Sequence, residues 1–352
     1  MLPFVSVVVI TKNNVKTVEK CINNLLNQEY SREYYEIVFV DGHSSDGTDE
    51  IIEKYAQVYP IIKLYYEEYG TIGYARNVGI NESKGDIIAY IDGDAYPPKD
   101  WVIKIVDAFN NDDKLAIIGG LDVLTTEHGE IAGGRVVIDS WRRLKRKVGI
   151  KAIPCIKTVN FAIKRSVALA CGGFDQELSY WEEPELMARL YVKMGIINIL
   201  YDPQIYVYHE RSAKRSLRQR VKKVFRTSVV GVPVFLREHM IRVAVANLAS
   251  PIATSVYMIL ACVLGVPLLV FLTVNGLMLG TLGILLPLYF IVISIYTIYA
   301  SVYAKKFAVM LPLILTLDSA VRFAGTVYGL IEVLATCFKL NYARRLFRIF
   351  AT

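Results

Sequence analysis

The stretch Ile87-Ile88-Ala89-Tyr90-Ile91, followed directly by Asp92-Gly93-Asp94, decides how this chain folds. The apolar run predicts a buried strand whose two terminal carboxylates lie at one edge of a sheet, where open α/β sheets bind their ligands. Two carboxylates that close repel each other unless a cation lies between them, and hard divalent cations commonly hold substrate phosphates as well. The stretch therefore indicates a site for a metal and a diphosphate, although Asp-Gly is also a common turn dipeptide.

Short strands and helices alternate on both sides of this stretch. Such alternation predicts a mostly parallel α/β sheet of the Rossmann type. Thr11, Asp41 and Asp92 each follow or end a strand, so we expect them to meet at the carboxyl edge of the sheet. The predicted strands of this half are 5–10, 36–40, 61–66 and 86–91, and the predicted helices are 15–26, 49–58 and 74–82.

A second portion of the same domain extends to residue 212. Its predicted strands are 116–121, 135–138, 159–164, 197–201 and 205–209, its predicted helices are 165–171 and 182–193, and 140–151 is expected to be a basic helix or loop.

The character of the chain changes near residue 241. Residues 251–274 and 276–304 carry no charged side chain, and each run exceeds the roughly 20 residues that span a hydrocarbon core. Residues 307–338 are also apolar but include Asp318, Arg322 and Glu332. We expect an α-helical membrane region over 243–338 with about three hydrophobic helices, and whether the last one crosses stays open. The alternative is a buried helical core in a soluble protein.

The net charge of +7 is concentrated in basic clusters at 142–151, 214–226 and 344–348. Clusters beside spanning helices fit the positive-inside rule and attraction to anionic lipids. They predict basic amphipathic interfacial helices over 213–242 and a basic C-terminal tail over 339–352. No secretory signal is visible, so residues 1–212 are expected to be cytoplasmic and the protein to be an integral protein of the plasma membrane. Nucleic acid is the competing partner, but no nucleic-acid motif is present.

Several segments in one order resemble a family 2 glycosyltransferase with the GT-A fold. The resemblance rests on Ile10-Thr11-Lys12-Asn13, Val40-Asp41-Gly42-His43-Ser44-Ser45-Asp46-Gly47-Thr48, Ala75-Arg76-Asn77-Val78-Gly79, Asp92-Gly93-Asp94, Asn160-Phe161-Ala162-Ile163-Lys164-Arg165, Gly172-Gly173-Phe174-Asp175 and Glu182-Glu183-Pro184-Glu185-Leu186 with Arg189-Leu190. With the predicted membrane helices, the layout is similar to cellulose-synthase-like enzymes and to archaeal mannosyltransferases that build lipid-linked N-glycans.

The resemblance implies the chemistry and the partners. A sugar leaves its nucleoside diphosphate, donated by GDP-mannose or else a UDP-hexose, for a polyprenyl phosphate or a polyprenyl-linked glycan, in assembly of N-glycans or cell-surface glycans. The leaving group needs a cation, magnesium or manganese, and the acceptor hydroxyl needs a base. The absence of Trp after Gln219-Arg220-Val221-Lys222-Lys223 favours transfer of one sugar over synthesis of a long polymer.

The implied site residues fall into four groups. The metal ligands are Asp94, Asp92 and His209; the donor contacts are Thr11, Asn13, Asp41, Arg76 and Asp92; the base is Glu183, with Glu182 as second choice; and the acceptor side includes Asn160 and Lys222. Glu183 stands where the family has aspartate, which lengthens the arm by one methylene. A single base implies direct displacement with inversion at the anomeric carbon.

Two other functions remain as alternatives. The first is a membrane transport or scaffold protein whose nucleotide-binding domain does not turn over, which the intact carboxylates at Asp92, Asp94 and Glu183 disfavour. The second is a nucleotidyltransferase, which usually has a glycine-rich loop after the first strand; Thr11-Lys12-Asn13-Asn14 has no glycine.

Overall fold

The computed structural model describes residues 2–125, 146–147, 156–195, 198–210, 222–223, 225–227, 231 and 234. The chain divides into two compact units, Met1–Ala213 and Lys214–Thr352. Among the described residues, no helix has both the length and the hydropathy needed to cross a membrane. The predicted membrane region at 243–338 and the tail at 339–352 lie outside the described residues, as does most of 213–242.

The first half of the sheet is parallel, as the alternating pattern predicts. Four strands stand side by side in the order β3-β2-β1-β4. Nearly every residue of β1, β2 and β4 is buried, because helices cover both faces of a parallel sheet. The elements are β1 Val5–Thr11, α1 Val18–Leu26, η1 Arg32–Tyr34, β2 Tyr35–Asp41, α2 Thr48–Val58, β3 Ile62–Tyr66, α3 Ile72–Glu82 and β4 Ile87–Asp92.

The second half continues the same sheet with mixed pairing. Strand β8 pairs antiparallel with β4 and β6, β9 runs parallel to β6, and β5 and β7 each pair antiparallel with β9. The elements are β5 Ala95–Tyr96, α4 Trp101–Asn110, β6 Leu115–Thr125, β7 Arg146–Lys147, η3 Thr158–Asn160, β8 Phe161–Lys164, α6 Arg165–Cys171, α7 Glu182–Met194 and β9 Asn198–Glu210.

Two predictions for this half are wrong. Residues 146–147 form a short strand rather than part of a basic helix or loop, because they pair with Leu200 and Tyr201 of β9. The strands predicted at 197–201 and 205–209 are one strand, β9, whose register against β6 shifts between Gly120 and Leu121. Such an irregularity lets one strand continue past residues that look like a turn in sequence.

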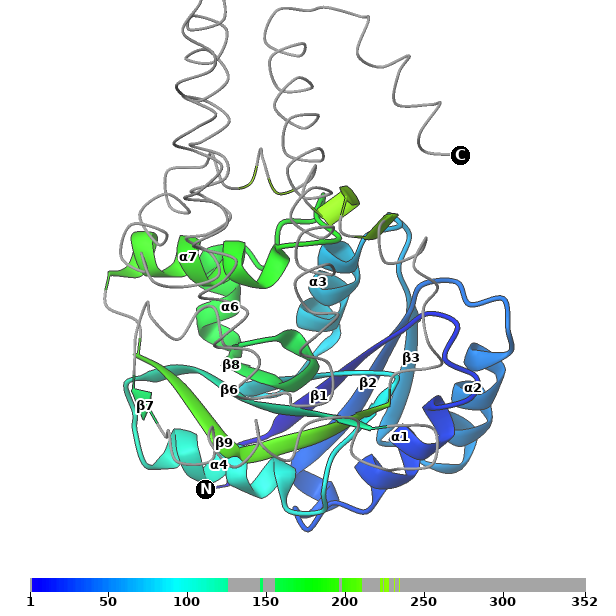
Figure 1. The fold of residues 1–352 in the computed structure, drawn as a ribbon. Helices are drawn as coiled ribbons and strands as arrows, with labels where there is room; N and C mark the ends of the chain where they lie inside the picture. The colour runs from blue at the N-terminus through cyan, green and yellow to red at the C-terminus, as the bar shows by residue number, and fades with distance from the viewer. Residues whose placement is uncertain are drawn as a thin grey trace, which may run out of the picture. The chain divides into compact units, whose positions relative to one another are not determined.

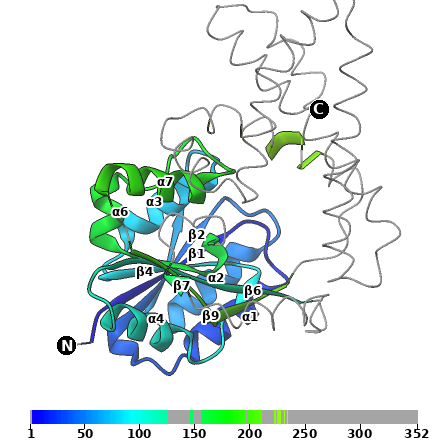
Figure 2. The same ribbon diagram turned by 60° about the vertical axis from the view of Figure 1, so that its left-hand side comes forward.

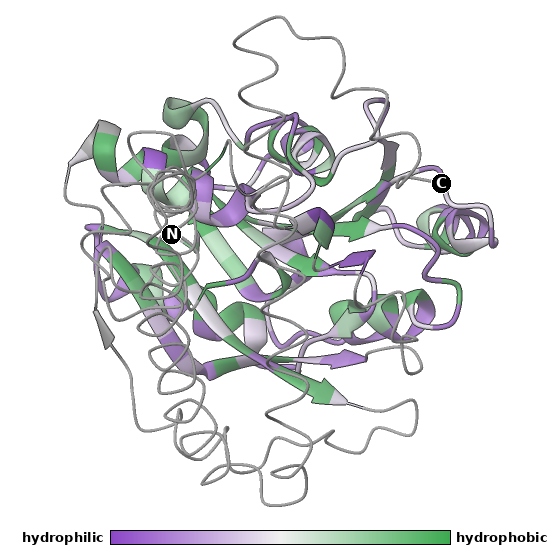
Figure 3. Ribbon diagram, turned by 45° about the horizontal axis from the view of Figure 1, so that its top comes forward, coloured by the Kyte–Doolittle hydropathy of each residue, from purple (hydrophilic) through white to green (hydrophobic). Residues whose placement is uncertain are grey.

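The helices lie in two layers, one on each face of the sheet. Figures 1 and 2 show α3, α6 and α7 on one face and α1, α2 and α4 on the other. The hydropathy colouring in Figure 3 shows hydrophobic residues on the strands and helices of this unit. Helix α3 lies close on the sheet because Gly79 has no Cβ, and an added Cβ would meet the side chain of Val8 in β1. Arg76 lies one turn earlier on α3, and its backbone oxygen accepts a hydrogen bond of 3.2 Å from the Tyr90 hydroxyl of β4.

Candidate functional site

The carboxyl ends of β1, β2 and β4 bring the predicted polar residues to one edge of the sheet. In the strand register, Thr11 is the partner of Asp41 and Ile10 is the partner of Asp92. The Thr11 hydroxyl donates a hydrogen bond of 2.6 Å to the Asp41 carboxylate. The predicted meeting of Thr11, Asp41 and Asp92 at one edge is therefore confirmed.

Asp41 organises the loop that follows β2. Its side chain is fully buried, and besides Thr11 it accepts hydrogen bonds from the backbone N–H of Ser44 at 2.6 Å and from the Ser44 hydroxyl at 2.8 Å. These bonds fix the chain at Ser44 beside the end of β1. A contact of Asp41 with a nucleotide base stays a prediction, since in this conformation its carboxylate is engaged inside the protein.

Asn13 joins the loops after β1 and β2. It adopts a left-handed backbone conformation with φ 55°, which asparagine tolerates better than most residues. Its side-chain oxygen accepts a hydrogen bond of 2.9 Å from the Ser45 N–H, and its own N–H donates to the Ser44 hydroxyl at 2.8 Å. Asn13 thus shapes the rim of the predicted donor side, and a direct contact with the donor stays a prediction.

The predicted metal ligands Asp92, Asp94 and His209 come together although they lie far apart in sequence. One ligand atom from each lies within 4.8 Å of the others, and His209 Nε2 is 3.3 Å from Asp94 Oδ1. Antiparallel pairing of Ala95 in β5 with His209 in β9 brings them together. Gly93 lies between the two aspartates because a Cβ there would be only 2.6 Å from Thr11 Cγ2.

Burial and neighbouring charges shift the pKa values of His209 and Asp92. Burial lowers the pKa of His209, but Asp122 and Asp94 outweigh it and raise this pKa to about 9. Burial raises the pKa of Asp92 to about 6, with Arg76 opposing and Asp94 adding to the rise. Asp122 lies 3.8 Å from His209 Nδ1, which is an ion-pair contact rather than a hydrogen bond. The imidazole therefore lies among carboxylates that together favour positive charge at this point.

This donor set fits a divalent cation. Two carboxylate oxygens and one imidazole nitrogen are ligands that Mn²⁺ accepts and that Mg²⁺ accepts in part. The Nδ1 atom of His209 is buried and has no hydrogen-bond partner among the described residues, whereas Nε2 faces Asp94 at 3.3 Å. Asp92, Asp94 and His209 would hold the ion, which supplies charge to neutralise a departing diphosphate.

The acidic pair Glu182 and Glu183 begins helix α7. Trp181 precedes them with φ 68°, a conformation that is strained for a bulky residue and is typical of functional sites. Glu182 forms a buried ion pair with Arg76 of α3. Glu183 Oε1 accepts a hydrogen bond of 2.9 Å from the Thr158 hydroxyl and lies 3.5 Å from the Thr158 N–H. The two glutamates therefore have different partners and different surroundings.

The protonation of the two glutamates differs accordingly. Burial and the charge of Glu183 raise the pKa of Glu182 to about 7, although Arg76 opposes this. For Glu183, burial is outweighed by Arg76 and by hydrogen bonds, including those from Thr158, so its pKa is lowered. The charge of Asp92 also contributes to raising the pKa of Arg76. Arg76 therefore links the acidic pair to the predicted metal site, and a direct contact with a donor diphosphate stays a prediction.

Arg189 fixes the position of α7. Its guanidinium forms two hydrogen bonds of 3.0 Å with Glu185 one turn earlier. It also donates to the backbone oxygens of Cys171 at 2.6 Å and of Gly173 at 2.7 Å. A planar guanidinium holds several acceptors in fixed directions. Arg189 thereby anchors α7 to the end of α6, and so holds the helix start at Glu182 in place.

The structure corrects the acceptor-side role of Asn160. Its side chain is 1% exposed, its Oδ1 accepts from Trp101 Nε1 at 2.9 Å, and its Nδ2 donates to the backbone oxygens of Leu121 and Ile205, both at 3.0 Å. These bonds occupy both amide hydrogens, so Asn160 ties β6, β9 and α4 together instead of facing a substrate. Lys222 belongs to the second unit, and its role stays a prediction.

Three residues of the site were missed in the sequence. Thr158 contacts Glu183, Asp122 contacts His209, and Ser44 contacts Asp41. Ser44 lies within the segment 40–48 that resembles the nucleotide-binding segment of the family, so its role could have been predicted from the sequence. Thr158 of η3 and Asp122 of β6 contact the site from elements distant in sequence from Glu183 and His209, and no local sequence pattern marks such a contact.

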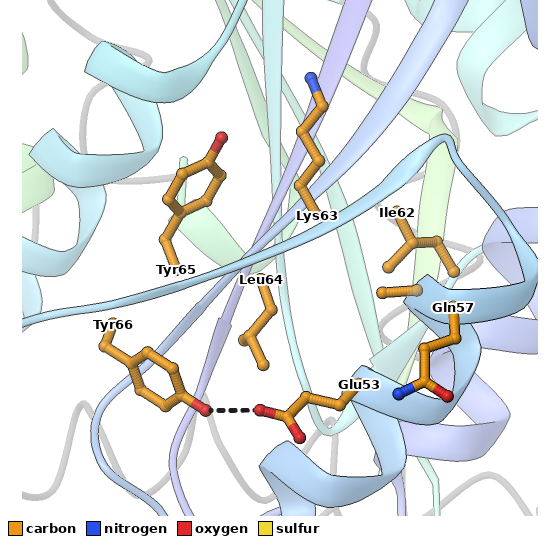
Figure 4. Close-up of a pocket in the computed structure, with 8 residues that line it drawn as sticks. Glu53, Gln57, Ile62, Lys63, Leu64, Tyr65 and Tyr66 are labelled. Atoms are coloured by element: carbon orange, nitrogen blue, oxygen red, sulfur yellow. Dashed lines mark hydrogen bonds between the residues drawn. The ribbon is translucent and has the colours of Figure 1, made fainter.

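A surface cavity of about 540 Å³ lies elsewhere, between α2 and strand β3. Figure 4 shows its lining, in which the Tyr66 hydroxyl donates to Glu53 at 3.3 Å. None of the predicted metal, donor or base residues lines it. The chemistry therefore has to be sought at the sheet edge and not in this cavity.

Residues 6–170 match the family described as Glycosyl transferase family 2. The chain is 33% identical over 178 residues to the glycosyltransferase AglE of Haloferax volcanii, covering 50% of this chain and 58% of that protein. It is 33% identical over 124 residues to a dolichyl N-acetyl-alpha-D-glucosaminyl phosphate 3-beta-D-2,3-diacetamido-2,3-dideoxy-beta-D-glucuronosyltransferase of Methanococcus voltae, covering 34% of this chain and 39% of that protein. The matches thus span about half the length of these curated relatives.

Solved structures show the same fold. The mannosyltransferase PcManGT from Pyrobaculum calidifontis, in complex with GDP-Man and Mn²⁺, has a TM-score of 0.51 at 20% identity, covering 79% of this chain and 86% of that chain. S. aureus TarS 1-349, in complex with UDP-GlcNAc, has a TM-score of 0.52 at 18% identity, covering 93% and 90%. The predicted GT-A-like α/β fold is confirmed, and residues 6–170 of this chain match the family described as Glycosyl transferase family 2.

Proposed function

We propose that this protein is a metal-dependent, inverting glycosyltransferase that moves a hexose from a nucleotide sugar to a polyprenyl-linked acceptor at the cytoplasmic face of the plasma membrane. One observation carries the proposal. The sheet edge brings together Asp92, Asp94 and His209. Arg76, which forms a buried ion pair with Glu182 at the start of α7, has its pKa raised by the charges of Glu182, Glu183 and Asp92. A cation site next to a carboxylate base is what displacement of a nucleoside diphosphate by a hydroxyl requires.

Each of these residues has a separate role in the proposed reaction. Asp92, Asp94 and His209 would hold Mn²⁺ or Mg²⁺ beside the departing diphosphate, while Thr11, Asn13 and Asp41 shape the side that receives the nucleotide. Glu183, held as an anion, takes the proton from the acceptor. Arg76 and Glu182 keep the two halves in register. A single base of this kind supports direct displacement with inversion.

The finer identities rest on resemblance and on relatives. GDP-mannose is our preferred donor and a UDP-hexose the second choice. The relative from Methanococcus voltae carries dolichyl phosphate in its name, which supports a polyprenyl-linked acceptor and a role in N-glycan or cell-surface glycan assembly. A membrane location accords with the uncharged runs at 251–274 and 276–304.

A panel of nucleotide sugars with purified full-length protein tests the proposal. We expect manganese-dependent consumption of one donor, its loss in Asp94→Ala, and retained donor binding but lost transfer in Glu183→Gln. Lys99→Ala serves as a control, since Lys99 is an exposed residue paired only with Glu29 at 2.6 Å in the described part of the chain. Failure to bind any nucleotide sugar would refute the transferase and favour a membrane transport or scaffold protein.

A further inference from the structure

The surroundings of Glu183 carry an excess of negative charge. The carboxylates of Glu182 in α7 and Asp92 in β4 both interact electrostatically with Glu183, and Thr158 of η3 supplies neutral donors. Among the residues that the structure describes, the guanidinium of Arg76 in α3 interacts with these three carboxylates, and it is paired with Glu182. A divalent cation would compensate Asp92 and leave the two glutamates facing one arginine. The described groups on the base side of the site are thus together anionic or, with one shared proton, close to neutral.

Such surroundings discriminate between two kinds of acceptor. The reacting oxygen of a lipid phosphate already carries negative charge, so it needs no base and is repelled by nearby carboxylates. A sugar hydroxyl is neutral, is not repelled, and becomes a good nucleophile only when a base takes its proton. A half-buried, anionic carboxylate is therefore useful for the second acceptor and harmful for the first.

Thr158 fixes one oxygen of the Glu183 carboxylate in position. Thr158 is 2% exposed, and both its hydroxyl and its N–H point at the same oxygen, Glu183 Oε1, at 2.9 and 3.5 Å. A glutamate has one more rotatable bond than an aspartate and more freedom to lose. The contact fixes that longer arm by Oε1, and we assign the proton of the acceptor to Oε2.

We propose, on the basis of the function proposed above, that the acceptor presents a neutral hydroxyl, as a lipid-linked glycan does, and that Thr158 positions Glu183 to deprotonate it. The hydroxyl oxygen forms a bond to the anomeric carbon as its proton passes to Glu183. The bond from that carbon to the diphosphate breaks, and its electron pair leaves with the nucleoside diphosphate. No oxidant or further reactant is needed.

Two acceptors and two matched variants test this inference in the full-length protein. The acceptors are a polyprenyl phosphate and the same lipid carrying one phosphate-linked hexose. Thr158→Val removes the hydroxyl at nearly constant shape, and Thr158→Ser retains it. We expect transfer to the hexose-bearing lipid, with kcat lowered about 10- to 100-fold in Thr158→Val and close to normal in Thr158→Ser, because a hydrogen bond to a charged group is lost only in the first.

A positioning role leaves two further signatures. The KM for the donor stays unchanged in Thr158→Val, and the acidic limb of its pH profile moves to higher pH, because Glu183 loses a hydrogen bond to its charged form. Glu183→Asp tests the same contact from the side of the glutamate, with Thr158 unchanged. Withdrawing the carboxylate by one methylene takes it out of reach of Thr158, so kcat falls by a similar factor without loss of donor affinity.

The outcomes separate this inference from the proposed function. Equal or faster transfer to the polyprenyl phosphate, or equal kcat in Thr158→Val, Thr158→Ser and wild type, would overturn the inference while the transferase stands. If neither lipid accepts the sugar, the rate of donor hydrolysis, with water as the neutral nucleophile, is compared between Thr158→Val, Thr158→Ser and wild type in the same way. Absence of any donor consumption would instead refute the proposed function.

Discussion

Replacing Arg76 by methionine tests how the donor half and the base half of the site depend on each other. Arg76 is 4% exposed, pairs with Glu182, and its charge also acts on Glu183 and Asp92. Methionine retains an unbranched chain that fills a similar space but has no charge. The substitution therefore leaves Glu182 buried without its cation.

The expected cost can be worked out from the geometry. Removing one partner of a buried ion pair costs about 3 to 5 kcal/mol, because the other charge is left uncompensated. We expect the lower value, about 3 kcal/mol, since Glu182 can take up a proton: burial and Glu183 already raise its pKa to about 7. Without Arg76 this folded-state pKa rises further above the unfolded value. Stability is then lost as pH rises between the two values, so the cost at pH 8 exceeds the cost at pH 5.

Urea unfolding followed by tryptophan fluorescence measures this cost. The chain has three tryptophans, Trp101, Trp141 and Trp181, and all lie in the unit Met1–Ala213, so the signal reports on that unit. Arg32→Met is the matched control, because Arg32 is exposed, its guanidinium donates a hydrogen bond of 3.0 Å to the backbone oxygen of Leu26, and it lies 6.0 Å from the centre of the Tyr59 ring. We expect the control to cost less than about 1 kcal/mol.

The reasoning is refuted by either of two results. The first is a cost for Arg76→Met that does not exceed the cost for Arg32→Met at pH 8. The second is a cost for Arg76→Met that is the same at pH 5 and pH 8, which would mean that Glu182 is not the group left unpaired.

Three shorter predictions concern the metal site and the sheet. Gly93→Ala places a Cβ 2.6 Å from Thr11 Cγ2, so the backbone between the two aspartates must move. Mn²⁺ affinity, measured by calorimetry, should then fall at least about tenfold. An unchanged affinity would contradict the close packing at Gly93. Asp122→Asn removes the charge beside His209 and should weaken Mn²⁺ binding about 10-fold to 100-fold in the same assay, whereas a tighter site would show that Asp122 opposes the ion. The pKa of buried Glu36 is lowered because hydrogen bonds outweigh its burial, so the stability that Glu36 contributes is present above its ordinary pKa and is lost as pH falls through the folded value. Glu36→Gln should therefore destabilise the protein by about 1 to 3 kcal/mol at pH 7 and by less at pH 3. A loss of stability that does not depend on pH would exclude this cause.

The parallel half of the fold was predictable because each strand is an apolar run bounded by turn residues. Strand β4, Ile87–Asp92, was expected within one residue of where it lies. Helix α4, Trp101–Asn110, was not predicted, although Trp101, Ile105 and Phe109 recur at helical spacing and are buried. The short strand at 146–147 exists only through pairing with β9, and a pairing partner distant in sequence leaves no local pattern.

The site was predictable at its ligands and less so at their supports. Asp92 and Asp94 follow from a strand that ends in carboxylates, and the family resemblance adds His209 and the acidic pair. Thr158 could not be found in this way, because its role depends on the approach of η3 to α7 in three dimensions. Asn160 was placed on the acceptor side by resemblance, yet three internal hydrogen bonds make it a core residue.

The stereochemistry of the transferred sugar tests the central claim most directly. With a donor whose anomeric configuration is known, proton NMR of the first product formed by the full-length protein reports the configuration at the new bond. One base, Glu183, and direct displacement predict inversion, with no product from Glu183→Gln. Retention of configuration, or unchanged product formation by Glu183→Gln, would contradict the account, since both require a route that does not pass through this carboxylate.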